Sequence, residues 1–329
     1  MIKLATIGTS GICQQFLDAM SLTGEFKLVS VYSRTAQKGE EFAGKNNCNK
    51  VYTDLFEMAK DKNIDAVYIA SPNVFHFEQS RIFLENGKHV ICEKPITSSL
   101  SEYKELKSLA DSKGLIYMEA IMSRHNKSRE MLLSGIEKIG DIRMARIDFN
   151  QRSSRLDSFL LGEQINIFDM SLHAGTLMDL GIYCVYAAVD LFGIPKAITA
   201  KSNFFSNGAD SSGCAIFDYG GFSAFLTYGK SGQSLIGSEI IGDMGTVKIS
   251  SVSLYQGISL FKDGKETDLS EQETRVQIMS YEAKAFANYI LRFNQYKEEY
   301  SKVSSLCADV HYCMDKIKQS AGIIYPDKI

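Results

Sequence analysis

The feature that most limits the fold is a regular alternation over the first 120 residues. Short apolar runs alternate there with stretches in which apolar residues recur at helical spacing. Strands that alternate with helices of this length indicate parallel βαβ units, with helices on both faces of one sheet. The predicted strands are 2–7, 26–32, 66–70, 89–92 and 115–118, and the predicted helices are 13–22, 35–46, 74–86 and 100–112.

The pattern changes after about residue 142. One helical stretch, 176–192, precedes a series of strand-like runs that are separated by turn signals such as Gly220-Gly221 and Asp263-Gly264. Such a series is typical of an open, mostly antiparallel sheet. The predicted strands are 197–205, 213–219, 222–228, 234–241, 246–249 and 254–261, and helices are predicted at 274–295 and 301–322.

We therefore predict an α/β protein with two domains. Residues 1–120 form a Rossmann dinucleotide-binding domain. Residues 121–329 form an α+β domain built on the open sheet, and the last helix is free to pack back on the first domain.

Composition excludes several classes of protein. The 36 Lys and Arg residues nearly balance the 39 Asp and Glu residues, so the net charge of −3 argues against a nucleic-acid partner. The seven cysteines are odd in number and contain no C-x-x-C pair, which argues against a disulfide framework. The five histidines show no close-spaced group of ligands, so we expect no metal site. There is no signal-peptide pattern and no apolar run of roughly 20 residues, so we expect a cytoplasmic protein without a membrane partner.

A glycine-containing turn joins the first predicted strand to the first predicted helix. Dinucleotide-binding folds need small residues there, so that free N–H groups and the helix dipole meet the pyrophosphate. The full pattern is G-x-G-x-x-G/A, and here Ser10 and Cys13 replace its second and third glycines. The position of the turn favours a cofactor-binding loop over a tight turn without a ligand. Its predicted cofactor contacts are Gly8, Thr9, Ser10, Gly11 and Ile12.

The end of the second predicted strand favours NADP over NAD. An NAD-preferring fold usually places Asp or Glu there, whereas this chain has Ser33 and Arg34, with Lys38 one turn later. A hydroxyl and two cations suit a 2′-phosphate, because arginine bonds phosphate bidentately. The alternative is that Arg34 and Lys38 merely solvate the start of a surface helix.

A lysine follows the fourth predicted strand, in Glu93-Lys94-Pro95, and ligands bind at the carboxyl ends of strands in open α/β sheets. With this motif the chain resembles the glucose–fructose oxidoreductase, inositol dehydrogenase and rhizopine-catabolism (Gfo/Idh/MocA) family. Tyr183, which stands where many members have histidine, resembles the dihydrodiol dehydrogenase-like branch of that family. The segments that carry the resemblance are 8–13, 71–73 with His76, 93–95, 118–120 with Arg124, 175–183 and 321–326.

The resemblance implies a role for each matching residue of the first domain. Lys94 would stand beside the nicotinamide as a catalytic residue, and Glu93 would contact the nicotinamide ribose. A cis bond is expected before Pro95. The alternatives are that Lys94 is a solvated loop lysine and that His76 is a helix cap or a core residue. The further cofactor contacts that the resemblance implies are Ser71, Pro72, Asn73, His76 and Arg124.

In the second domain the resemblance falls on Asp179 and Tyr183, which are four residues apart and so share one face of a helix. Hydride transfer at a carbinol or carbonyl carbon needs a group that exchanges the hydroxyl proton. We assign this role to Tyr183, with Lys94 as its electrostatic partner, because a nearby cation favours the phenolate. Asp179 would orient the substrate or the lysine. The alternative is that Tyr183 packs in a helix core.

Together these residues predict an NAD(P)-dependent oxidoreductase that acts on CH–OH groups of a sugar, polyol or vicinal diol. The alternative is a non-catalytic NAD(P)-binding sensor on the same fold. The stretch 151–172 is expected to form a wall of the substrate pocket, and His173 to contact substrate or cap a helix. The resemblance implies that the second domain binds the substrate and forms a homodimer or higher oligomer through its sheet. The candidates for the subunit contact are Phe225, Val247, Ile249 and Leu254.

Overall fold

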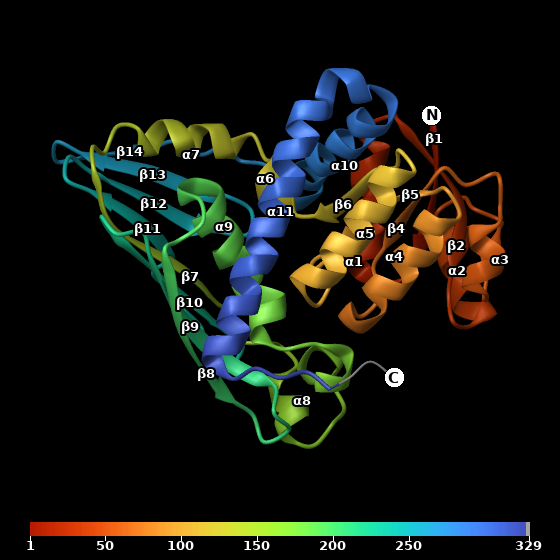
Figure 1. Ribbon diagram of the computed structural model, residues 1–329, viewed down its shortest axis with the longest axis horizontal. Coiled ribbons are helices and arrows are strands. Elements are labelled where there is room, and N and C mark those ends of the chain that lie inside the picture. Colours follow the sequence, from red (N-terminus) through yellow and green to blue (C-terminus); the bar gives the residue numbers. More distant parts are fainter. Residues whose placement is uncertain (327–329) are drawn as a thin grey trace. The chain divides into compact units, whose positions relative to one another are not determined.

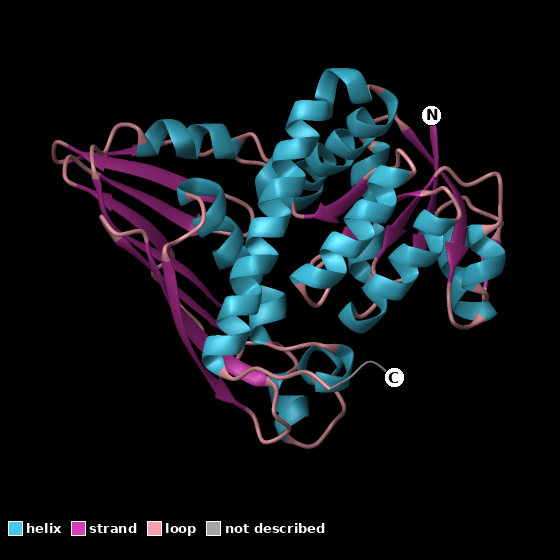
Figure 2. Ribbon diagram, in the orientation of Figure 1, coloured by secondary structure: helices cyan, strands magenta, loops and turns pink. Residues whose placement is uncertain are grey.

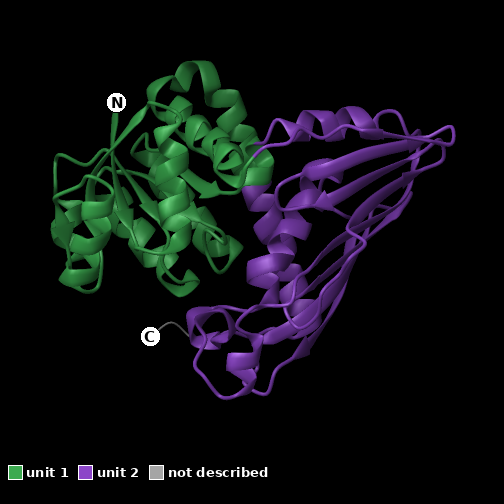
Figure 3. Cartoon of the chain, turned by 180° about the vertical axis from the view of Figure 1, so that it is seen from behind, with its two compact units in different colours: residues 1–125, 274–305 green, residues 126–273, 306–329 purple. Residues whose placement is uncertain are grey.

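The computed structural model describes residues 1–326, and the chain divides into two compact units (Figure 3). Unit 1 contains residues 1–125 and 274–305, and unit 2 contains residues 126–273 with those from 306 onward. Each unit contains one sheet with helices packed on it (Figure 2). Both units are discontinuous in sequence, whereas the two predicted domains are contiguous.

Unit 1 is built on a six-stranded parallel sheet with the order β3-β2-β1-β4-β5-β6. This order reverses between β1 and β4, which is the doubly wound arrangement of dinucleotide-binding folds. The predicted Rossmann architecture is thereby confirmed. The strands are β1 (Ile2–Ile7), β2 (Phe26–Tyr32), β3 (Val51–Tyr52), β4 (Ala66–Ile69), β5 (His89–Glu93) and β6 (Tyr117–Ala120).

The helices of unit 1 follow from the apolar spacing, and several have capping residues. Asp54 accepts hydrogen bonds from two N–H groups at the start of α3, and Ser99 accepts one at the start of α5. Helix α10 follows unit 2 in sequence but packs against α1 and α6 of unit 1. The helices are α1 (Gly11–Ser21), α2 (Ala36–Lys45), α3 (Leu55–Ala59), η1 (Asn73–Phe75), α4 (His76–Glu85), α5 (Leu100–Ser112), α6 (Met122–His125) and α10 (Arg275–Leu291).

Unit 2 is built on an eight-stranded sheet with the order β14-β13-β12-β11-β7-β10-β9-β8. Only the β7–β10 pair is parallel, so the predicted mostly antiparallel sheet is confirmed. The strands are β7 (Ile142–Asn150), β8 (Ala197–Phe204), β9 (Asp210–Asp218), β10 (Ser223–Gly229), β11 (Ser238–Gly242), β12 (Thr246–Ser251), β13 (Gln256–Lys262) and β14 (Lys265–Asp268).

Helices α7 and α9 cover one face of this sheet (Figure 1). The long α11 (Phe293–Ala321) begins in unit 1 and ends in unit 2. The other helical segments of unit 2 are short and lie mainly between β7 and β8. They are α7 (Ser128–Ile136), α8 (Leu156–Leu160), η2 (Asn166–Phe168), η3 (Met170–Leu172), η4 (Leu177–Gly181) and α9 (Ile182–Phe192).

The opposite face of the unit 2 sheet carries exposed apolar side chains. Phe225 and Ile216 are neighbours across the β9–β10 pair, and they are 39% and 42% exposed. The side chains of Val247 and Ile249 lie instead in the core. The expectation that Val247 and Ile249 form a subunit contact is therefore wrong, because alternation along β12 turns both of them inward.

One segment, Met170–Phe192, is long and apolar enough to cross a membrane by length and composition alone. The expectation that no apolar run approaches this length is therefore wrong for this segment. Its most apolar window is 78% buried inside the protein. Burial of this extent is that of a helix in a protein core, and the segment includes the candidate site residues of unit 2.

Candidate functional site

The loops that follow β1, β2, β4 and β5 meet at one edge of the unit 1 sheet, because these strands are parallel neighbours in the order β2-β1-β4-β5. Gly8, directly after β1, has a φ of +116°, and a Cβ atom there would lie 2.9 Å from the carbonyl oxygen of Ala70. Only glycine fits such a close approach between two loops. The backbone is thus packed tightly at the point where the strand order reverses.

The start of α1 fits an anionic group. Among the described residues Ser10 makes no side-chain capping bond to this helix, and a Cβ on Gly11 would meet no atom within 4 Å. The first N–H groups of a helix without such a cap are donors for phosphate oxygens. Thr9 and Ile12 flank this position and are half-buried. The turn therefore has the donors and the space that a dinucleotide pyrophosphate needs.

The loop after β2 presents cations at the surface. Arg34 and Lys38 are both exposed, and the first turn of α2 contains no acidic residue. Ser33 is buried, and its hydroxyl accepts a hydrogen bond from the N–H of Thr35 at 3.4 Å. No carboxylate of this first turn would repel a phosphate.

His76 connects the loops after β4 and β5. Its Nδ1 lies 2.8 Å from the carbonyl oxygen of Pro95, and its Nε2 lies 2.8 Å from that of Ser71. The ring is buried, and burial lowers the pKa of His76. Ser71 also donates to Gln79 through its hydroxyl at 2.7 Å. The His76 ring thus lies between the two loops, and in its neutral form it donates a hydrogen bond to one of the two carbonyl oxygens. Pro72 and Asn73 are half-buried.

Glu93 ends β5 and is held by a tyrosine that sequence reasoning missed. The hydroxyl of Tyr68, in β4, donates to Glu93 Oε1 at 2.5 Å, and its ring stacks on Phe16 of α1 at 3.9 Å. Burial raises the pKa of Glu93 above its usual range. Lys94 follows in a half-buried position, and the bond before Pro95 is cis, as the resemblance predicts.

Arg124 lies in α6, which follows β6 after a single residue. Burial raises the pKa of Tyr289, and the positive charge of Arg124 lowers it in part. All of the predicted cofactor contacts of unit 1 except Lys38 and Arg124 therefore lie at the carboxyl ends of β1, β2, β4 and β5 or in the segments that directly follow them.

In unit 2 a buried aspartate fixes the start of the segment that carries Asp179 and Tyr183. Asp210 accepts hydrogen bonds from the N–H of Thr176 at 3.0 Å and from that of Leu177 at 2.7 Å, one on each carboxylate oxygen. Burial raises the pKa of Asp210, and these bonds oppose the rise. Such a contact caps a helix N-terminus and pairs a carboxylate with the helix dipole.

The segment that Asp210 caps is a π-helix, η4, which continues directly into α9. Helical turns of this rare type are frequent at functional sites. Asp179 lies within the π-helix and Tyr183 in the first turn of α9. The ring of Tyr183 is nearly buried and packs edge-on against Phe149 at 5.7 Å. Tyr183 thus comes from a rigid element.

Asp179 has a partner that the sequence analysis did not identify. Its Oδ2 lies 2.8 Å from the Nζ of Lys230, which follows β10. The predicted contact of Asp179 with substrate or with Lys94 remains a prediction. Lys230 directly follows the carboxyl end of β10, an inner strand of its sheet, as Lys94 follows β5, and this position was the available signal.

His173 lies just before η4 with a φ of +52°. Its Nε2 lies 3.1 Å from the carbonyl oxygen of Pro326, and its ring stacks on that of Tyr325 at 5.0 Å. The end of the described chain is thereby held against the segment before the π-helix. His173 is also the C-cap of the short helix η3, where its N–H donates to the carbonyl oxygen of Met170 at 3.0 Å, and it does not cap the helix predicted at 176–192. Its contact with substrate remains a prediction.

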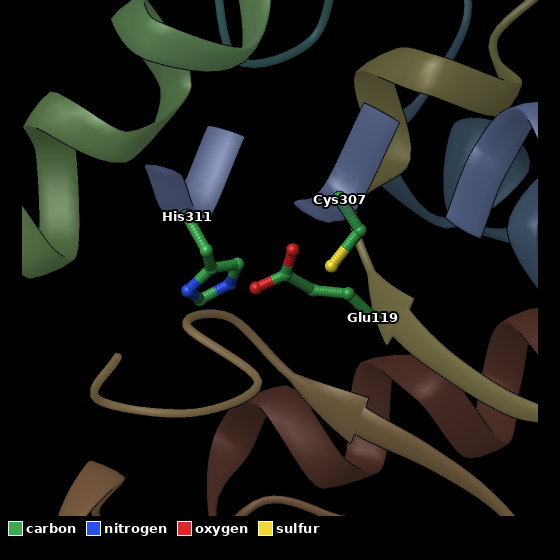
Figure 4. Close-up of side chains that lie close together, drawn as sticks. All are labelled: Glu119, Cys307 and His311. Carbon is green, nitrogen blue, oxygen red and sulfur yellow. The ribbon is translucent and has the colours of Figure 1, made fainter. Parts of the chain in front are cut away.

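One histidine does have a nearby cysteine, contrary to the sequence expectation. Cys307 and His311 are buried one helical turn apart on α11, and Figure 4 shows both side chains. A cysteine and a histidine on one helix are two of the four ligands that a structural zinc site needs.

We expect Gly175→Ala to destabilise the protein by about 2 to 4 kcal/mol. Gly175 has a φ of +141°, and a Cβ atom there would collide with the carboxylate of Asp210. The substitution therefore strains the backbone and displaces the cap of η4. Urea denaturation measures the effect. Gly232→Ala is the matched control, because a Cβ there meets no atom within 4 Å. An equal midpoint for both variants would contradict the expectation.

Two protein-family models match the chain. The model of the "Oxidoreductase family, NAD-binding Rossmann fold" matches residues 2–121, and that of the "GFO/IDH/MocA C-terminal domain" matches residues 125–248. The scyllo-inositol 2-dehydrogenase (NADP(+)) IolU of Bacillus subtilis is 37% identical over 99% of both chains. The trans-1,2-dihydrobenzene-1,2-diol dehydrogenase of Xenopus tropicalis is 28% identical over 92% of both.

A solved structure shares the fold of the whole chain. The 3-ketoreductase KijD10 of Actinomadura kijaniata, in complex with NADP and TDP-benzene, superposes with a TM-score of 0.83. It is 20% identical, and the match covers 97% of this chain and 98% of that one.

Proposed function

Because the chain belongs to the GFO/IDH/MocA family of oxidoreductases, we propose that it is an NADP-preferring dehydrogenase of polyols, sugars or vicinal diols. The observation that carries this proposal is the meeting of four loops at one edge of the unit 1 sheet, with Lys94 at the end of β5. The names of the relatives from Bacillus subtilis and Xenopus tropicalis support the substrate class.

The cofactor would be held along the loops of unit 1. The turn at residues 8–12 would bind the pyrophosphate. The 2′-phosphate would be bound by Ser33, Arg34 and Lys38. The loop of residues 71–73 would contact the middle of the cofactor. Glu93 would contact the nicotinamide ribose, and Lys94 and Arg124 would lie near the nicotinamide. When bound, NADP⁺ supplies the hydride acceptor of the reaction.

The side chains of the protein would handle the proton. As the C–H bond of the carbinol carbon breaks and its hydride leaves, the O–H proton passes to the oxygen of Tyr183 and a C=O bond forms. Lys94 favours the phenolate of Tyr183 and stabilises negative charge on the substrate oxygen. Asp179 orients the substrate by accepting a hydroxyl hydrogen bond. In the reverse direction Tyr183 returns the proton.

We expect Arg34→Ala to raise the Kd for NADPH about 10- to 100-fold, because a charge-assisted bond to the 2′-phosphate is lost. The Kd for NADH should stay within about 2-fold, since NADH has no such phosphate. Titration of the protein with each nucleotide measures both constants. Lys27→Ala, which removes an exposed cation near the other end of β2, is the control. Equal losses for the two nucleotides would contradict the assignment.

Turnover tests the proposed reaction itself. The absorbance of reduced nicotinamide is followed in both directions with inositols, aldoses, vicinal diols and their carbonyl products. We expect NADP-dependent turnover of at least one polyol or diol. Tight NADPH binding without turnover of any of them would instead favour a non-catalytic sensor.

We further propose a homo-oligomer that buries the face of the unit 2 sheet with Phe225 and Ile216, because these side chains lie exposed side by side. Sedimentation at micromolar concentration should give the mass of two or more chains, and a monomer would contradict this. A cytoplasmic location is proposed from the seven cysteines, all of which are free.

A further inference from the structure

We propose that Lys230 is a positioning residue of the substrate site, whose ammonium group holds the Asp179 carboxylate and the segment 151–173 in one arrangement. The proposal rests on the function proposed above for Asp179. It also gives a role to the segment between β7 and η4, which matches no pattern in the sequence.

The side chain of Lys230 is only 3% exposed, and its ammonium group has an anionic partner and a carbonyl partner. Its Nζ lies 2.8 Å from Asp179 Oδ2 and donates to the carbonyl oxygen of Ile167 at 3.2 Å. It also lies 5.4 Å from the centre of the Phe168 ring, within the range of a cation–π contact. A buried ammonium requires such partners, because without them its desolvation is costly.

The backbone of Lys230 is fixed on both sides. Its N–H donates to the carbonyl oxygen of Ser211 at 2.9 Å, and its own carbonyl oxygen accepts from the N–H of Ser153 at 2.9 Å. Gly229 packs directly against Asn150 and Ser212, so that a side chain would not fit there. Lys230 therefore projects from the rigid end of β10 and is itself bonded to the start of the segment.

The other end of the contact is anchored as well. Phe168 is buried in a cluster with Phe159 and Phe205, at ring distances of 4.7 and 5.3 Å. Asn207 donates to the carbonyl oxygen of Phe168 at 2.7 Å. The aromatic cluster fixes the segment to the sheet, and the ammonium group joins the segment to Asp179.

This geometry has a consequence for catalysis. The Asp179 side chain is 39% exposed, so it remains accessible to a ligand while Lys230 fixes one of its oxygens. A carboxylate group accepts hydrogen bonds through its oxygens. Lys230 would therefore orient Asp179 toward a hydroxyl of the substrate. It would also keep the segment 151–173, the proposed pocket wall, at a fixed distance from Asp179.

The experiment compares Lys230→Met with the matched control Lys262→Met in the full-length protein. Lys262, the last residue of β13, also donates to a backbone carbonyl of unit 2, that of Lys138. With a polyol that the wild type oxidises, Lys230→Met should lower kcat/KM about 10- to 100-fold, as expected for loss of a charged hydrogen-bonded pair. The Kd for NADPH and the activity of the control should stay near wild type.

Two readouts separate positioning from general damage. The double variant Lys230→Met/Asp179→Asn should be no slower than Asp179→Asn alone, because the two residues act as one unit. Hydrogen exchange of the amides of residues 151–173 should accelerate in Lys230→Met and not in Lys262→Met. Lys230→Arg, which keeps the charge, should recover part of the lost kcat/KM.

Wild-type kcat/KM and unchanged exchange in Lys230→Met would overturn the proposal, as would fully additive losses in the double variant. If Lys230→Met does not fold, amide hydrogen exchange in Asp179→Asn tests the proposal instead. Because this variant removes the charge at the other end of the pair, the amides of residues 166–168 should exchange faster than in the wild type. If the wild-type protein oxidises no polyol, the proposed function is contradicted. The exchange measurement then still tests whether Lys230 holds the segment 151–173.

Discussion

Tyr183→Phe should lower kcat about 10²- to 10⁴-fold, the usual contribution of a positioned acid or base. The variant removes only the hydroxyl oxygen that would exchange the substrate proton. The ring of Tyr183 is nearly buried against Phe149, and phenylalanine keeps that packing. The Kd for NADPH should therefore stay within about 2-fold, because the cofactor contacts that we propose come from unit 1.

A matched control distinguishes this effect from a general response to losing a tyrosine hydroxyl. Tyr312→Phe, on the exposed surface of α11, makes the same change outside the candidate site. Single-turnover kinetics should show the slow step only in the Tyr183 variant. A Tyr183→Phe enzyme with wild-type kcat would show that the tyrosine is a core residue and that another group moves the proton.

Lys94→Met should lower kcat/KM at least about 10²- to 10³-fold, the range for loss of one electrostatic donor in an active site. Methionine keeps most of the length of the side chain but has no charge. The lysine would otherwise favour the phenolate of Tyr183 and stabilise charge on the substrate oxygen. Because the pyrophosphate and the 2′-phosphate would bind elsewhere, the Kd for NADPH should change little.

The control for Lys94→Met is Lys104→Met, an exposed lysine on the outer side of α5. Steady-state kinetics and nucleotide titration are measured on both variants. If the Lys94→Met enzyme turns over at the wild-type rate, Lys94 is a solvated loop lysine and has no role in the reaction. A large loss of NADPH affinity would assign it to cofactor binding rather than to the reaction.

Sequence periodicity was sufficient for most of the fold. The strands of unit 1 read as apolar runs because helices bury both faces of a parallel sheet. Strand β7 was missed although it lies inside the second sheet. Its outward residues include Arg146, Asp148 and Asn150, so that its apolar residues only alternate. The break between the two closing helices is predicted at residues 296–300 but lies at Arg292, where neither proline nor glycine marks it.

The candidate site was predictable only in part. Residues that follow strands, such as Gly8, Arg34 and Lys94, could be located because parallel strands place their carboxyl ends at one edge. The pairs Tyr68–Glu93 and Asp179–Lys230 were not predicted, because each joins distant parts of the chain. The one signal for them was the position of Lys230 directly after a strand. The π-helix is defined by its backbone hydrogen bonds, for which local sequence gives no clear signal.

Transfer of deuterium tests the central claim most directly. The protein is incubated with NADP⁺ and a polyol deuterated at the carbinol carbon, with scyllo-inositol as the first choice, and the NADPH formed is analysed by mass spectrometry. Direct hydride transfer predicts that NADPH gains one deuterium, and that none forms with Tyr183→Phe or Lys94→Met on the same timescale. NADPH without deuterium, or no NADPH from any polyol, sugar or diol, would contradict the proposed reaction.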